Sequence, residues 1–303
     1  MRAGLWTQWR RRLRVRTRLR RWWRRRDPTR TRLPRVFANS LPKAGTHLLL
    51  RSVALMPGMA WEEIGLRRGW LVSERGEASA GGPDVVPVGV AEVRWVRVDK
   101  LAELIRRLEP GEVTGGHMPH SPGFAALLEQ ERIRALFIVR DPRDVAVSLM
   151  YHILGQPERR LGEHFLRAFK NDRERLRACI LGTEGVPGRT FLGLGRRLEL
   201  FLPWLRMPGV HTVRFERLVG PRGGGSEEAQ QAEIAGIAGH LGLPLAPAQI
   251  RQIGSQLFGQ GSTFRRGQIG SWREHFQEEH KAALKQVAGQ YLIELGYERD
   301  LDW

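Results

Sequence analysis

The sequence has little cysteine and no long apolar run. Its 303 residues include a single cysteine, Cys179, which excludes an internal disulfide and any metal site built from several cysteines. We expect Cys179 to be a buried, unreactive thiol in a protein of a reducing compartment, the cytoplasm. No stretch approaches the length of about 18 apolar residues that a membrane-spanning helix needs. These absences leave a globular cytoplasmic protein as the expectation.

Lysine is absent from residues 1–35, and acid is scarce there. This segment holds fifteen arginines and one acid, Asp27, so it carries +14 of the formal net charge of +18. The rest of the chain carries only +4. The basicity therefore belongs to a tail, predicted to span residues 1–34, and not to the folded body, predicted as one domain over residues 35–303. We expect no specific nucleic-acid partner for that body.

Two interpretations of the tail remain open. Its tryptophans and leucines fall near helical spacing between the arginines, which is typical of a cationic amphipathic helix lying on anionic lipid. The alternative is a solvated, disordered arm that self-repulsion keeps extended. Under the first interpretation the protein is peripheral at a membrane surface.

The body alternates short β-branched runs with longer helical patterns. We predict strands over residues 36–39, 113–115, 135–139 and 210–215, and helices over residues 47–56, 142–154, 227–241 and 274–295. Such alternation predicts an α/β, P-loop-like fold, with a mainly parallel sheet and helices on both faces. Residues 57–98 and 155–190, rich in Gly, Pro and Arg, are expected to form insertions that select the substrate.

The first candidate motif is LPKAGT at residues 41–46, between the first strand and the first helix. A glycine-containing turn before a helix N-terminus presents free N–H groups to an anion, and Lys43 adds a positive charge. The order differs from the nucleotide-kinase loop GxxxxGK[ST], because Lys43 precedes Gly45 and no Ser or Thr stands directly after the lysine to hold Mg²⁺. Alone, the segment is equally compatible with an ordinary turn.

The second and third motifs are FIVRDPRDVAVS at residues 137–148 and FRRGQIGSW at residues 264–272. In the second, Asp141 is placed to cap the following helix, Arg140 ends a strand, and Ser148 lies on the Asp144 face of the helix. The alternative there is a set of surface ion pairs at a helix start. In the third, Arg265, Arg266 and Gly267 suit an anion approached closely by backbone, and Trp272 is expected to anchor the loop. Alone, this segment is equally compatible with an ordinary basic loop.

In this order, the three segments resemble the PAPS-dependent sulfotransferases, where PAPS is 3′-phosphoadenosine 5′-phosphosulfate. That family reads PK[ST]GT, then R(D/N)x(K/R)DxxxS, then RKGxxG[DN]W, and the resemblance covers residues 35–300. It implies transfer of a sulfuryl group to an acceptor hydroxyl, with PAPS as co-substrate, 3′-phosphoadenosine 5′-phosphate (PAP) as product and no metal required. Ala44 and Leu48 depart from the family pattern, at a donor position and at the position of a tryptophan.

The resemblance also implies roles for individual residues. The 5′-phosphosulfate would be held by the loop residues Lys43, Ala44, Gly45, Thr46 and His47. The 3′-phosphate would be held by Arg140, Ser148, Arg265, Arg266 and Gly267. Phe215, in RFERL, would lie near the adenine. His117, in GGHMP, would be the general base, and Lys43 would assist catalysis.

Among the other histidines, His120 is a weaker candidate base, and His152 is expected to be structural. Two alternative functions stay open: a P-loop nucleotide kinase or NTPase, and an RNA- or lipid-binding protein led by its tail. The acceptor could be a saccharide, a lipid or a small metabolite, and the oligomeric state is not predicted.

Overall fold

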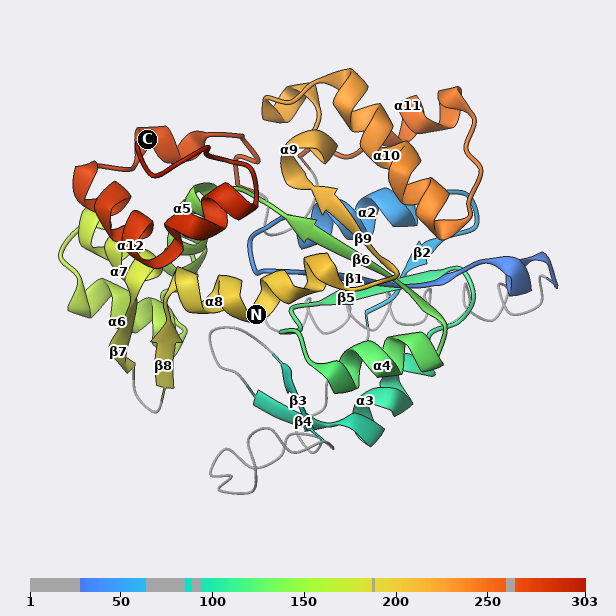
Figure 1. Ribbon diagram of the computed structural model, residues 1–303, viewed down its shortest axis with the longest axis horizontal. Coiled ribbons are helices and arrows are strands. Elements are labelled where there is room, and N and C mark those ends of the chain that lie inside the picture. Colours follow the sequence, from blue (N-terminus) through green and yellow to red (C-terminus); the bar gives the residue numbers. More distant parts are fainter. Residues whose placement is uncertain (1–27, 64–84, 89–93, 187–188, 260–264) are drawn as a thin grey trace, which may run out of the picture.

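Residues 28–63, 85–88, 94–186, 189–259 and 265–303 are described by a computed structural model. Most of the predicted tail and Phe264 lie outside these ranges. The described chain is built around one five-stranded sheet in the order β2-β5-β1-β6-β9, in which every neighbouring pair is parallel (Figure 1). Its strands are β1 (Arg35–Ser40), β2 (Ala60–Trp61), β5 (Glu112–Gly116), β6 (Ile133–Val139) and β9 (Val210–Arg214).

Helices surround this sheet and form most of the remaining structure. They are α2 (Thr46–Ala54), α3 (Val98–Ile105), α4 (Pro122–Gln130), α5 (Pro142–Leu154), α6 (Arg160–Ala168), α7 (Asp172–Leu181), α8 (Leu194–Phe201), α9 (Phe215–Leu218), α10 (Glu227–Leu241), α11 (Pro247–Ser255) and α12 (Glu278–Glu294). The 3-10 turns are η1 (Pro28–Arg32), η3 (Leu202–Arg206), η4 (Pro221–Gly223) and η5 (Ser271–Glu274). Two small antiparallel hairpins pair β3 (Val85–Val88) with β4 (Arg94–Arg97) and β7 (Gly182–Val186) with β8 (Arg189–Leu192).

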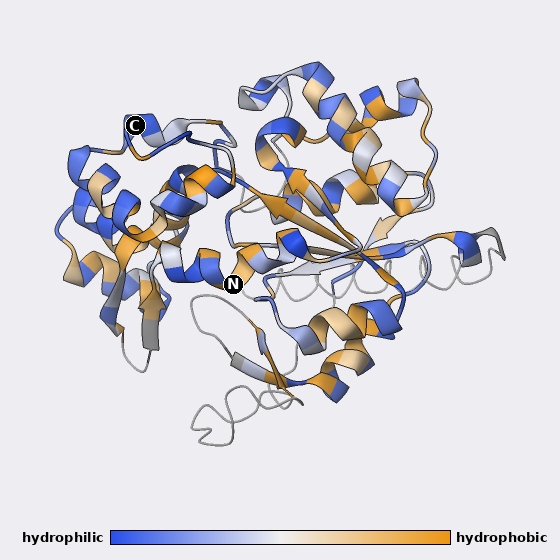
Figure 2. Cartoon of the chain, viewed as in Figure 1, coloured by the Kyte–Doolittle hydropathy of each residue, from blue (hydrophilic) through white to orange (hydrophobic). Residues whose placement is uncertain are grey.

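The two faces of the sheet bury separate apolar cores. Along β1, Val36 and Ala38 face the core shared with α2, α10 and α11, whereas Phe37 faces the core shared with α3, α4, α5 and α12. Most residues of the inner strands β1 and β6 are therefore buried, and β6 reads as a near-continuous apolar run, as is typical of a parallel sheet covered on both faces. Figure 2 shows apolar residues concentrated in central strands such as β6, and helices that combine apolar and hydrophilic residues. The predicted α/β fold with helices on both faces is confirmed.

The strand order fixes where a ligand can bind. From β1 the chain builds one side of the sheet, through β2 and β5, and then crosses to the other side for β6 and β9. In open parallel sheets, such a reversal leaves a crevice at the carboxyl ends of the strands. Each of the strands β1, β5, β6 and β9 is followed directly by one of the candidate site segments.

The segment just before β1 packs on the body. Arg30 donates to the Pro110 carbonyl oxygen (2.9 Å), and Leu33 packs against the core on the α2 face. The tail boundary at residue 34 stays a prediction. Within the described ranges, no helix is both long and apolar enough to cross a bilayer.

Candidate functional site

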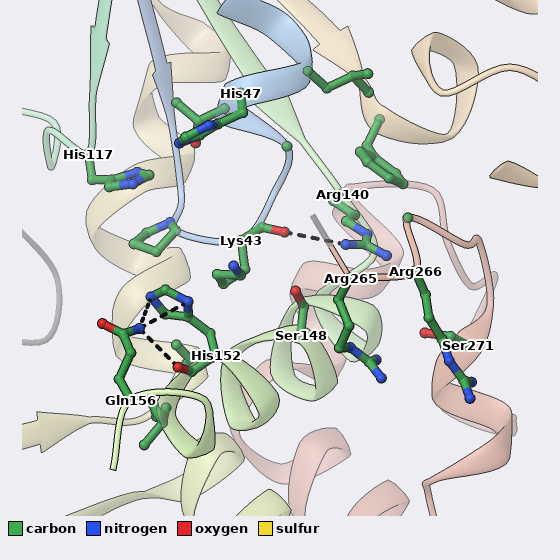
Figure 3. A pocket seen from close by; sticks show the side chains of 18 of the residues that line it. Lys43, His47, His117, Arg140, Ser148, His152, Gln156, Arg265, Arg266 and Ser271 are labelled. Carbon is green, nitrogen blue, oxygen red and sulfur yellow. Dashed lines mark hydrogen bonds between the residues drawn. The ribbon is translucent and has the colours of Figure 1, made fainter. Parts of the chain in front are cut away.

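A cavity of about 740 Å³ opens at the carboxyl ends of the strands (Figure 3). It brings together nearly all the residues predicted for the site, from segments far apart in the sequence. Those that line it are Lys43, Gly45, Thr46, His47, His117, Arg140, Ser148, Phe215, Arg265, Arg266 and Gly267. Ala44 is the exception. Its side chain is buried in the core, and its amide donates to the Leu41 carbonyl oxygen (3.1 Å), so it does not face the cavity.

The loop between β1 and α2 has an unusual backbone. Lys43 (φ 73°) and Gly45 (φ 110°) both adopt left-handed conformations, which a non-glycine residue seldom does. A Cβ at Gly45 would lie 2.7 Å from Cδ2 of Phe215 and 3.2 Å from Cδ1 of Ile138. Glycine is therefore required both by the conformation and by the close approach of the Phe215 ring. The turn delivers the N-terminus of α2 to the cavity.

Lys43 lies among other cations. Burial is the main cause that lowers its pKa, to about 8, and the nearby charges of Arg140 and Arg265 add to this effect. Holding a charged lysine beside two arginines costs less free energy when an anion occupies the cavity, because the anion offsets the repulsion among the three positive charges. The local electrostatics thus favour an anionic ligand.

His117 directly follows β5, and its ring is held by hydrogen bonds with Ser40 at the end of β1. Its Nδ1 donates to the Ser40 carbonyl oxygen (2.9 Å), and Ser40 Oγ, 3.3 Å from Nδ1, also contacts Thr46 Oγ1 (2.5 Å). Because a carbonyl oxygen only accepts, Nδ1 carries the proton and Nε2 keeps its lone pair. Burial lowers the pKa of His117, so the ring is neutral near pH 7. A neutral imidazole with a free Nε2 can accept a proton.

Two residues of β1 that the motifs did not identify support this histidine. Ser40 links His117 to the Thr46 hydroxyl. Asn39 exchanges two hydrogen bonds with the backbone of Met118, each 2.9 Å long. Polar residues at the end of an otherwise apolar strand were the available signal for both. His120, the alternative base, packs edge-on against Trp204 and is not among the residues lining the cavity.

Arg140, of the second motif, contacts residues of three other segments of the site. Its guanidinium stacks over the Phe215 ring (4.1 Å) and donates to the carbonyl oxygens of Gln268 (2.9 Å) and Lys43 (3.4 Å). Its Nε is buried and has no hydrogen-bond partner within the described chain. An unpartnered buried donor of this kind is costly unless a ligand oxygen approaches it.

Asp144 joins the second motif to the third. Its fully buried carboxylate accepts hydrogen bonds from the amides of Gly270 (2.8 Å) and Trp272 (2.9 Å) and from the hydroxyl of Ser271 (3.1 Å). Asp141 caps α5 as predicted, and its side chain accepts from the Arg143 amide. Both acids are buried, so the interpretation of this motif as surface ion pairs is wrong.

The third motif follows this junction. Trp272 is buried beneath the Arg143 guanidinium (4.1 Å) and anchors the loop, as predicted. Arg265 stacks over Tyr151 (4.0 Å), and Arg266 pairs with Glu274 (2.7 Å). Both arginines line the cavity, and the guanidinium group of each contacts one of these neighbouring side chains.

His152, expected to be structural, also lines the cavity (Figure 3). Its ring nitrogens lie 3.2 and 2.9 Å from Nε2 of Gln156. Burial, followed by the charge of Lys43, lowers the pKa of His152 to about 4. Its helical position beside Ser148 was the only sequence signal that it faces the site. Among the described residues, no group of three or more histidines, cysteines or acids is arranged to hold a metal ion.

Comparison with known proteins connects this geometry to one class of fold. No protein-family model and no curated protein sequence matches the chain. Among solved structures, mouse sulfotransferase SULT7A1 complexed with PAP is similar over 87% of both chains, with a TM-score of 0.58 and 14% identity. Retinol dehydratase in complex with androsterone and inactive cofactor PAP is similar over 86% of this chain and 82% of its own, with a TM-score of 0.50 and 18% identity. The chain therefore has the sulfotransferase fold.

Proposed function

We propose that this protein is a PAPS-dependent sulfotransferase that transfers a sulfuryl group to an acceptor hydroxyl. One observation carries the proposal: the three anion-binding segments and His117, separated by up to about 220 residues of sequence, line the same cavity. The fold it shares with proteins solved with bound PAP agrees with this.

The donor would lie across the carboxyl ends of β1, β6 and β9. The N–H groups at the start of α2, with Lys43, would hold the 5′-phosphosulfate. Arg140, Ser148 and the loop around Gly267 would hold the 3′-phosphate. Leu48, Phe215, Val219, Leu257 and Phe258 give the cavity an apolar wall on which the adenine would pack.

The residues on the other side would carry out the proton transfer. His117 Nε2 takes the proton of the acceptor hydroxyl while the acceptor oxygen forms a bond to sulfur. The bond from sulfur to the bridging phosphate oxygen breaks, and PAP leaves with the electron pair. Lys43 stabilises the charge that grows on that phosphate, an effect often worth about 3–4 kcal/mol per donor.

Two further points are inferred from composition alone: a cytoplasmic location, and contact of residues 1–34 with an anionic membrane surface. Neither is needed for the proposed chemistry, which uses only the cavity.

Ligand binding tests the donor assignment. We expect PAP to raise the melting temperature without Mg²⁺, because arginines, a lysine and backbone N–H groups supply the positive charge. Stabilisation by ATP that depends on Mg²⁺, with none by PAP, would instead support the nucleotide-kinase alternative. Labelled PAPS incubated with an extract of the source cell, followed by mass spectrometry, would then identify the acceptor product.

A further inference from the structure

The cavity extends beyond the groups assigned to the donor. In Figure 3, His117, His152 and Gln156 lie on one side of Lys43, and Arg140, Arg265 and Arg266 lie on the other. The first side is continued by residues 158–162, which lie at the end of the connection from α5 to α6 and in the first turn of α6, and by Phe191 of β8. If the proposed function holds, on which this inference rests, the acceptor must occupy this side.

The floor of this acceptor side is apolar. Leu149 and Ile153 of α5 and Phe191 of β8 are buried and line it, and Leu161 is half-buried beside them. Gly162, in the first turn of α6, packs closely against the chain that follows α5. An added Cβ there would lie 2.2 Å from the Gln156 carbonyl oxygen, so this close contact holds the start of α6 against the end of α5. An apolar surface of this kind favours an acceptor with a hydrocarbon or ring body.

The rim of the acceptor side is cationic. Arg159 and Arg160 are exposed and line the cavity, and their side chains make no ion pair or hydrogen bond within the described chain. Nearby arginines do have partners: Arg167 pairs with Glu163 (3.3 Å), and Arg175 pairs with Asp172 (2.8 Å). The two rim arginines thus keep their charge available at the cavity.

One acid offsets part of this charge. Glu158 also lines the cavity and makes no ion pair with either arginine, so the rim carries two positive charges against one negative charge. The charge of Arg159 acts on groups inside the cavity. Burial, then Lys43 and then Arg159 lower the pKa of His152. The field on the acceptor side is therefore positive.

We infer that the acceptor is an anionic amphiphile, with a hydroxyl directed to His117, an apolar body along α5 and Phe191, and a negatively charged group held by Arg159 and Arg160. The two neutral imidazoles, His117 and His152, suit the hydroxyl end. The rim arginines provide the selection for charge.

Binding to the full-length protein tests this inference in two steps. Calorimetry first measures the dissociation constant of PAP. With PAP bound, it then measures ω-hydroxy acids of eight, ten and twelve carbons against their methyl esters, so that several distances between hydroxyl and carboxylate are compared. For at least one length we expect the acid to bind about tenfold more tightly than its ester at low salt, as two partly exposed ion pairs would give.

Variants assign that preference to the rim. The double variant Arg159→Ala/Arg160→Ala should abolish the preference for the acid and leave the PAP dissociation constant unchanged. Glu158→Gln should enlarge the preference, because it removes the opposing charge. Arg167→Ala, on the same helix but not among the residues lining the cavity, is the matched control and should change neither value.

The outcomes separate the two proposals. If PAP does not bind, the proposed function fails, and this inference fails with it. If PAP binds but acid and ester bind equally, or neither binds, only the inference is overturned. A preference for the acid that survives the double variant also overturns it, because the charge selection then comes from other groups.

Discussion

At the scale of single residues, the orientation of His117 is set by its neighbours. The Ser40 carbonyl oxygen fixes the proton on Nδ1, and burial keeps the ring neutral. Ser40 Oγ connects it to Thr46 at the start of α2. The candidate base and the candidate phosphate-binding loop are therefore held by one strand end and should move together.

Replacing the candidate base should separate chemistry from binding. We expect His117→Ala to reduce kcat by about 10²–10⁴-fold, the usual contribution of a general base, with the PAP dissociation constant nearly unchanged. The measurement is turnover of PAPS with the identified acceptor, alongside calorimetry with PAP. His120→Ala serves as the control and should stay close to wild type. Activity of His117→Ala within a few-fold of wild type would remove His117 from the mechanism.

The pH dependence should be set by two groups with lowered pKa values. His117 must be neutral to accept a proton, so the rate should fall only when the pH drops below the usual histidine range. Lys43 must be charged to stabilise the phosphate, so kcat/KM for PAPS should fall above about pH 8. In Lys43→Arg the fall above pH 8 should disappear, because arginine stays protonated. If it persists in that variant, another group is responsible.

At the scale of elements, the loop before α2 depends on one glycine. Gly45→Ala would place a methyl group against Phe215 and force an L-residue into a left-handed conformation. We expect a loss of about 1–3 kcal/mol of stability, together with weaker PAP binding. Thermal unfolding and calorimetry measure the two effects.

Gly239→Ala provides the matched control for this substitution. Gly239 lies within α10, and an added Cβ there meets nothing within 4 Å. Because alanine is the better helix former, stability should be unchanged or slightly higher. Equal effects of the two substitutions would contradict the account of the loop.

A second element-scale prediction concerns the junction of α5 with the third motif. Asp144→Ala leaves the amides of Gly270 and Trp272 without their acceptor. We expect it to lower stability by about 2–3 kcal/mol and to weaken PAP binding, because the loop carrying Gly267 loses its attachment to α5. Asp99→Ala, which removes an exposed ion pair with Arg97 and the acceptor of the Lys100 amide, should cost much less stability because both groups remain open to water. Unfolding in urea and PAP titration compare the two variants. Unaltered PAP binding in Asp144→Ala would contradict this role.

At the scale of the whole molecule, charge and fold are separated along the chain. The residues that line the cavity lie between positions 42 and 271, whereas most of the positive charge lies in the tail. We therefore expect a variant lacking residues 1–27 to bind PAP as tightly as the full chain. The cut spares η1, where Arg30 packs on the body.

The same variant tests what the tail does. Under the membrane interpretation, it should lose binding to vesicles containing phosphatidylserine, since each arginine near such a surface contributes about 1 kcal/mol. Flotation of both proteins with these vesicles is the measurement. Vesicle binding by neither protein would support the solvated arm, and PAP binding lost with the tail would contradict the separation.

Much of this architecture could be predicted from local patterns. The predicted helices over residues 142–154 and 227–241 match α5 and α10, because Asp141 and Pro142 mark the start of one and Gly242 the end of the other. β2 was not predicted, since two residues give no periodicity, and it exists only by pairing with β5. α6 and α7 lie within residues 155–190, for which the sequence predicted an insertion without element bounds.

The fold class, the three candidate anion-binding segments and the candidate base His117 were all predictable from the sequence. These depend on apolar periodicity and on residue order, which are local properties. Only the tertiary structure decided which side chains meet. In the folded chain Ala44 and Asp144 are buried, and Ser40 contacts His117. His152, Arg159 and Arg160 line the same cavity. Such contacts depend on which strands are neighbours in the sheet, because the segments after neighbouring parallel strands meet at the carboxyl edge. That order exists only in the packed sheet.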